Sequence, residues 1–154
     1  MEMKKIIILS ITLSLACSIC RAHDKAKATQ YLKLYAQCDG KQIGKSLFMM
    51  KPDVFVGKIK NGKEMFVLDV RTKGEEKIIG MNLPDTLFVP MNKVFDETVL
   101  SKLPKDKPIV VLCQTGLRSA LITMGLRDIG FSNAFFLKDG IKKLSEFLTP
   151  KEAN

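Results

Sequence analysis

The chain has 154 residues, of which 46% are apolar and 27% are charged, and its formal net charge is +9. This length and composition fit one globular domain, and the basic balance favours anionic ligands or partners. No basic cluster with interleaved aromatic residues is present in the sequence, so nucleic acid is not an expected partner.

Residues 1–22 have the order of a bacterial secretory signal: MEMKK is a short charged start, IIILSITLSLA is an apolar run, and CSICRA supplies small residues. An uncleaved membrane anchor needs about 20 apolar residues, more than this run provides. We therefore predict a signal peptide at 1–22 and export to the periplasm. LSLAC also resembles a lipobox, so lipidation of Cys17 is the alternative, and a membrane contact is expected only in that case.

Removal of the leader would leave two of the four cysteines, Cys38 and Cys113, and a net charge of +7, since three basic residues and one acidic residue are lost. An oxidising compartment permits a disulfide between them, provided that their Cα atoms lie within about 7 Å. Two cysteines are too few to staple a small scaffold, so the apolar core is expected to hold the domain together.

In the first half of the chain, apolar residues at helical spacing predict a helix at 26–38, within a helical extension that covers residues 23–43. A strand at 46–50 and a helix at 52–62 are expected next, the helix opening on proline and stopping at Asn-Gly. Residues 65–70 form an apolar run typical of a strand buried on both faces. A short helix at 72–80 follows, with Thr72 as its cap and Glu75 three residues on.

The second half, still within a domain expected at 44–150, continues the alternation of strands and helices. Strands are predicted at 86–90, 108–112 and 134–137, and helices at 94–103, 119–130 and 140–148. The fold class is therefore α/β, with a five-stranded, mainly parallel sheet and helices on both faces. Asp69 and Cys113 both come at carboxyl ends of strands, where ligands gather in such folds.

The segment after the fourth strand, CQTGLRS (residues 113–119), carries the chemistry. A turn that passes Gly116 can curl into a cradle of backbone N–H groups, and Ser119 can cap the following helix, whose N-terminus adds positive potential. With Arg118 nearby, the Cys113 thiol should have a lowered pKa. A buried, inert cysteine is the alternative interpretation.

Four segments together resemble the single-domain rhodanese sulfurtransferases: FVLDVRT, the glutamates at 75 and 76 with Gly80, CQTGLRSA and GFSNAFFLKDGI. The resemblance covers about residues 44 to 148. It implies a rhodanese-like fold without metal or cofactor. It also implies that Cys113 takes a sulfane sulfur from thiosulfate or polysulfide as a persulfide and passes it to cyanide, a thiol or a partner protein.

The resemblance also assigns roles to single residues. Arg118 helps to hold the anionic donor, Asp69 and Arg71 brace the site, and the backbone of Gln114, Thr115, Gly116 and Leu117 supplies donors. Six residues from Cys113 to Arg118 match the sulfur-handling loop, whereas relatives that handle phosphate or arsenate have one residue more.

The sequence departs from the family at three places. Gln114 stands where members commonly have arginine, GMNLPDT (80–86) replaces GHIPGA, and a single glycine follows the last strand. These departures keep a second hypothesis open: a module that carries a persulfide for a partner protein without turnover. A thiol–disulfide switch that uses Cys38 and Cys113 is the third.

Overall fold

A computed structural model describes residues 23–36, 38, 43–147 and 149. The chain divides into two units, Met1–Cys38 and Asp39–Asn154, and each is described by itself. In the first, helix α2 (Lys25–Ala36) confirms the helix predicted there. Asp24 starts it, since its carboxylate accepts from the backbone N–H groups of Ala26 and Lys27. The predicted leader at 1–22 lies outside the described residues, and in the described part no helix is long and apolar enough to span a membrane.

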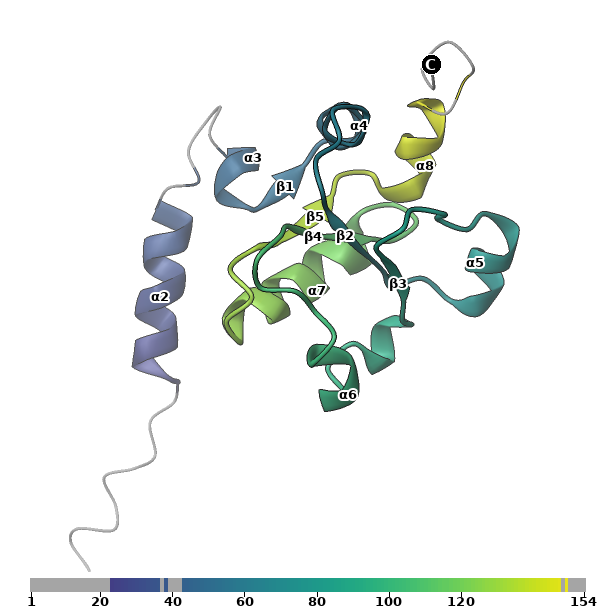
Figure 1. Ribbon diagram of the computed structural model, residues 1–154. Coiled ribbons are helices and arrows are strands. Elements are labelled where there is room, and N and C mark those ends of the chain that lie inside the picture. The colour runs from purple at the N-terminus through teal and green to yellow at the C-terminus, as the bar shows by residue number, and fades with distance from the viewer. Residues whose placement is uncertain (1–22, 37, 39–42, 148, 150–154) are drawn as a thin grey trace, which may run out of the picture. The chain divides into compact units, whose positions relative to one another are not determined.

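The second unit contains a sheet of five parallel strands in the order β1-β5-β4-β2-β3 (Figure 1). The strands are β1 (Met49–Met50), β2 (Phe66–Asp69), β3 (Thr86–Phe88), β4 (Ile109–Leu112) and β5 (Ala134–Leu137). The central strand β4 is apolar and buried along its whole length, as expected of a parallel strand covered on both faces. The predicted α/β class and the five-stranded parallel sheet are confirmed.

Helices connect the strands, and most lie where the sequence predicts them. Their bounds are α3 (Ile43–Ser46), α4 (Pro52–Lys60), α5 (Lys73–Ile78), α6 (Glu97–Leu100), α7 (Leu117–Asp128) and α8 (Gly140–Leu144), with 3-10 turns η2 (Met91–Lys93) and η3 (Ser145–Phe147). Several predictions were too long, among them the helix predicted at 140–148, which ends at Leu144 and is followed by η3. The strand predicted at 46–50 begins only at Met49, because Phe48 has a left-handed backbone (φ 58°). The helix predicted at 94–103 is reduced to α6, because Asp96 is extended and interrupts it.

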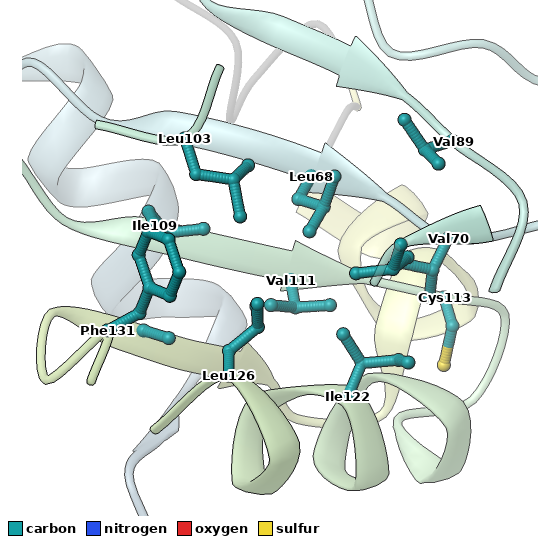
Figure 2. Close-up of a cluster of buried hydrophobic side chains, with 12 residues drawn as sticks. Leu68, Val70, Val89, Leu103, Ile109, Val111, Cys113, Ile122, Leu126 and Phe131 are labelled. Atoms are coloured by element: carbon teal, nitrogen blue, oxygen red, sulfur yellow. The ribbon is translucent and has the colours of Figure 1, made fainter. Parts of the chain in front are cut away.

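The core consists of two buried clusters, one on each face of the sheet. On the face that α4 and α8 cover in Figure 1, Phe55 and Ile141 pack against Val67, Val110 and Leu112. The second cluster lies on the face of α6 and α7, and Figure 2 shows it between the strands and α7. Its members include Leu68, Val70, Ile109, Val111, Cys113, Ile122 and Leu126. Cys113 therefore lies at the edge of this core, where β4 ends and the turn into α7 begins.

Candidate active site

The neighbouring strands β2 and β4 bring the two predicted site segments together at one edge of the sheet. Asp69 is the register partner of Leu112, so Cys113 comes immediately beyond the pair. The backbone N–H of Val70 donates to the carbonyl of Leu112 at 2.9 Å, which extends the pairing past the end of β2. Asp69 and Cys113 therefore both come at the carboxyl edge of the sheet, at the ends of neighbouring strands.

The Cys113 sulfur is fully buried, with an exposed fraction of 0%, and the loop folds around it. The backbone N–H of Gly116 lies 3.1 Å from the sulfur and that of Ser119 lies 3.4 Å from it. Gly116 has a φ of 96°, a left-handed conformation that glycine adopts without strain, and this conformation turns the chain back toward the thiol. Because the thiol is closed off from solvent, a donor or acceptor sulfur contacts it only when surrounding groups move.

Ser119 acts on the sulfur and not as the helix cap. The cap of α7 is Gly116, and Ser119 lies in the first turn, so the predicted capping role was wrong. Its hydroxyl donates to the carbonyl of Gly116 at 2.8 Å and accepts from the Cys113 thiol at 3.5 Å. After the thiol loses its proton, the same hydroxyl can rotate and donate to the thiolate, since a hydroxyl hydrogen rotates to suit its partners.

Burial alone would raise the pKa of the Cys113 thiol, because it disfavours the charged form. Hydrogen bonds from the Ser119 hydroxyl and from the backbone N–H groups of Ser119, Thr115 and Gly116 outweigh burial, and the pKa falls below its usual value. The cradle therefore stabilises a thiolate, which is the nucleophilic form of cysteine.

A pH profile should reveal this stabilisation. We expect the rate of Cys113 alkylation by iodoacetamide to reach half its maximum below about pH 8.5, the usual pKa of a thiol. Ser119→Ala should move the midpoint upward, because the thiolate loses one donor. Ser101→Ala, at an exposed residue that follows α6, is the matched control and should leave the midpoint unchanged. Equal midpoints for all three proteins would show that the hydroxyl does not stabilise the thiolate.

Arg118 does not stand alone in the loop, because Glu75 of α5 binds it through two hydrogen bonds, Nη1–Oε2 at 3.0 Å and Nη2–Oε1 at 2.5 Å. The Arg118 side chain and the backbone N–H of Thr72 lower the pKa of Glu75 to about 2. The hydrogen bonds that Arg118 donates to Glu75 raise the pKa of Arg118, and the Cys113 thiolate adds to that rise. The sequence analysis recognised Glu75 only as the partner of Thr72 in a capping box, which the structure confirms, and missed its second partner.

Asp69 and Arg71 form an ion pair that is almost fully buried, with each side chain 1% exposed. Arg71 donates from Nε and Nη2 to both carboxylate oxygens, with 2.6 Å for the shortest contact. Its Nη2 also donates to the carbonyl of Ile79 at 2.7 Å, just beyond α5. The pair thereby ties the end of β2 to the helix that carries Glu75.

Gly140 lets the start of α8 pack against the backbone of the loop that begins at Cys113. The N–H of Ile141 donates to the Cys113 carbonyl at 2.8 Å, and that of Lys142 to the Gln114 carbonyl at 3.2 Å. A Cβ on Gly140 would lie 2.3 Å from the Cys113 oxygen, so only glycine fits this contact. The sequence analysis noted this glycine after the last strand but did not predict its contact with Cys113.

The remaining candidate residues are either exposed on the loop or belong to the other unit of the chain. The side chains of Gln114, Thr115 and Leu117 are exposed, so these residues line the outer surface of the loop. Cys38 belongs to the first unit, where its thiol lies 3.6 Å from the carbonyl of Leu34. Both described cysteines are free thiols. Within the residues that the structure describes, no group of three or more His, Cys, Asp or Glu side chains could hold a metal ion.

The rhodanese-like domain model matches residues 51–146, and the chain belongs to this family, as the resemblance predicted. Among relatives, the chain is 30% identical over 79 residues to a sulfurtransferase of Allochromatium vinosum, a match that covers 51% of this chain and 70% of the relative. It is also 30% identical over 90 residues to the probable adenylyltransferase/sulfurtransferase MoeZ of Mycobacterium tuberculosis. That match covers 58% of this chain and only 22% of MoeZ. These findings support sulfur transfer as the general chemistry.

Solved structures agree with the fold. A rhodanese-like domain protein from Staphylococcus aureus superposes with a TM-score of 0.55 at 24% identity, over 62% of this chain and 89% of that one. At this identity the likeness shows the fold alone.

Proposed function

We propose that the protein is a sulfurtransferase that moves a sulfane sulfur from a donor to a thiol acceptor through a persulfide on Cys113. The observation that carries this proposal is the buried Cys113 sulfur. It accepts hydrogen bonds from the backbone N–H groups of Gly116 and Ser119, and the pKa of the thiol is lowered. Such a thiol is poised to attack sulfur, and the general chemistry of the relatives points the same way.

The reaction has two displacement steps. The Cys113 thiolate attacks the sulfane sulfur of the donor, a new S–S bond forms, and the donor's bond to that sulfur breaks as its remainder leaves with the electron pair. An acceptor thiolate then attacks the outer sulfur of the Cys113 persulfide, which frees the Cys113 thiolate and leaves the acceptor as a persulfide. The N–H groups of Gly116 and Ser119 offset the negative charge that returns to sulfur in each step.

Intact-mass analysis tests the proposal directly. After exposure to polysulfide and removal of excess donor, we expect the protein to gain about 32 Da per sulfur atom, and the gain to fall on the peptide that contains Cys113. Addition of a thiol acceptor should remove the extra mass. Folded protein that gains no mass, or gains it only on Cys38, would overturn the proposal.

A carrier that delivers its persulfide only to a partner protein is the second candidate. The complete burial of Cys113 favours it, because a persulfide in this position is shielded from small thiols. Steady-state assays with thiosulfate and cyanide distinguish the two: persulfide formation without turnover supports the carrier.

We also propose that the protein is exported. The support is the order of charged, apolar and small residues in 1–22. The same mass spectrum, taken on protein secreted by its host, gives the mature N-terminus: His23 after simple cleavage, or a lipidated Cys17.

A further inference from the structure

A groove with a volume of about 520 Å³ lies at the β1 edge of the sheet, where β1 is the outermost strand (Figure 1). The wall of this β1–α4 groove comes from α3, from both residues of β1, from the first part of α4, from Pro108 and from β5. None of its described wall residues belongs to the loop at 113–119. The groove is therefore a separate site from the one at Cys113.

The wall of the β1–α4 groove is largely apolar and continuous with the core. Met50 belongs to the buried cluster that α4 covers, and Phe135 packs against that cluster. Met49, Val54 and Pro108 add further apolar surface, and the Val54 side chain is 44% exposed. Water thus reaches apolar side chains at the margin of the core. An apolar ligand that covers them would gain about 25 cal/mol for each Å² removed from water.

Two lysines supply the charge of the groove. Lys51, Val54 and Lys58 are three and four residues apart, so they form one stripe along α4, beside the buried Phe55. Both lysines are exposed, as expected where the stem covers apolar surface and the ammonium group stays in water. In the part of the chain that the structure describes, the wall contains no carboxylate and neither lysine has an ion-pair partner. An anion can therefore pair with either one without displacing another group.

These features favour a small amphipathic anion over a protein partner. A stable protein interface takes about 20–30 residues from each side, whereas eight described residues line this groove. Its volume falls within the range of about 300–1,000 Å³ that is typical of sites for organic ligands, which have apolar walls and few polar groups. The charged groups are lysines, which act as point charges and suit a single carboxylate.

We propose that the β1–α4 groove binds a long-chain carboxylic acid. The apolar chain of the ligand covers Met50, Val54 and Phe135, and its carboxylate pairs with Lys51 or Lys58. Binding makes and breaks no covalent bond and does not involve the Cys113 thiol. The proposal therefore goes beyond sulfur transfer and can be tested separately from it.

Methionine-methyl NMR of the full chain tests the proposal, with laurate as the probe. Because Met49 and Met50 line the groove, their methyl signals should shift in a saturable way as laurate is added. The signal of Met91, which lines a different cavity beside Arg118, should stay in place. Dodecyltrimethylammonium has the same chain length and the opposite charge, and it should bind at least about tenfold more weakly. Acetate, which lacks the chain, should shift neither Met49 nor Met50.

Variants separate the charge from the apolar wall. The double variant Lys51→Gln, Lys58→Gln should weaken laurate binding at least about tenfold and should not weaken binding of the cationic probe. Lys73→Gln, Lys77→Gln is the matched control, since it removes two exposed lysines from α5, and it should keep the Kd for laurate within about twofold. Val54→Glu places a carboxylate in the apolar wall and should abolish binding.

Three outcomes would overturn the proposal. The first is folded protein in which laurate leaves Met49 and Met50 unshifted, and the second is an equal loss of affinity in the two double variants. The third is equal affinity for laurate and the cationic probe. Sedimentation velocity identifies the cause of an unresponsive groove: a dimer would mean that a second copy of the chain covers it. None of these outcomes changes the mass test for a persulfide on Cys113.

Discussion

A Cys113→Ser variant is expected to transfer sulfur at least about a thousandfold more slowly than the wild-type protein. Serine differs from cysteine by one atom, but its hydroxyl does not ionise at neutral pH and cannot hold a sulfane sulfur. The cradle offers the thiolate its N–H donors from Gly116 and Ser119, and these donors find no comparable anion in the variant. The measurement is the initial rate with polysulfide as donor and dithiothreitol as acceptor.

The matched control is Cys38→Ser, which removes the other described thiol from a different unit of the chain. It should keep the wild-type rate, because Cys38 has no part in the proposed displacement steps. Thermal unfolding followed by circular dichroism shows whether both variants fold. A folded Cys113→Ser protein with substantial activity would contradict covalent catalysis at this residue. Loss of activity in Cys38→Ser would instead favour the thiol–disulfide switch.

The local features of the site could be predicted from the sequence because neighbouring residues make them. Thr72 and Glu75 stand three residues apart, the spacing of a capping box, and the structure contains that box. The apolar run before Cys113 is a buried strand, and the glycine after it is the turn that lets the loop curl. In each case the pattern and its partner lie within one short segment.

Contacts between distant segments could not be predicted in this way. Glu75 and Arg118 are separated by 43 positions and meet only because β2 and β4 are neighbours in the sheet. Gly140 likewise closes on the Cys113 carbonyl only because β5 lies beside β4. The alternation of strands and helices predicts a parallel sheet, but it does not specify the order of the strands.

The error at Ser119 has a different cause. Serine is a favoured helix cap, and this preference alone predicted its role. The loop must instead bring two N–H groups to the sulfur of Cys113, so the helix starts earlier, at Leu117 after Gly116. Ser119 then falls in the first turn, where its hydroxyl reaches the thiol. The hydrogen bonds around Cys113 thus outweigh the preference of serine for the cap position.

Arg71→Met is expected to lower the free energy of unfolding by about 3–5 kcal/mol, because it leaves the buried carboxylate of Asp69 without its partner. It also removes a donor from the carbonyl of Ile79, which adjoins α5. Urea unfolding at pH 7 measures the loss. Activity should fall as well, even where the variant is folded, because α5 positions Glu75 against Arg118.

The double variant Asp69→Leu, Arg71→Met separates charge from packing. It removes both members of the pair, so no unpaired buried charge remains, and apolar side chains of similar volume often replace such a pair at little cost. We therefore expect the double variant to be more stable than Arg71→Met alone, although the carbonyl of Ile79 still lacks its donor. If the two effects simply add, so that the double variant is the less stable, then desolvation of Asp69 is not what Arg71 offsets. The Asp69–Arg71 pair would in that case contribute mainly through packing at the end of β2.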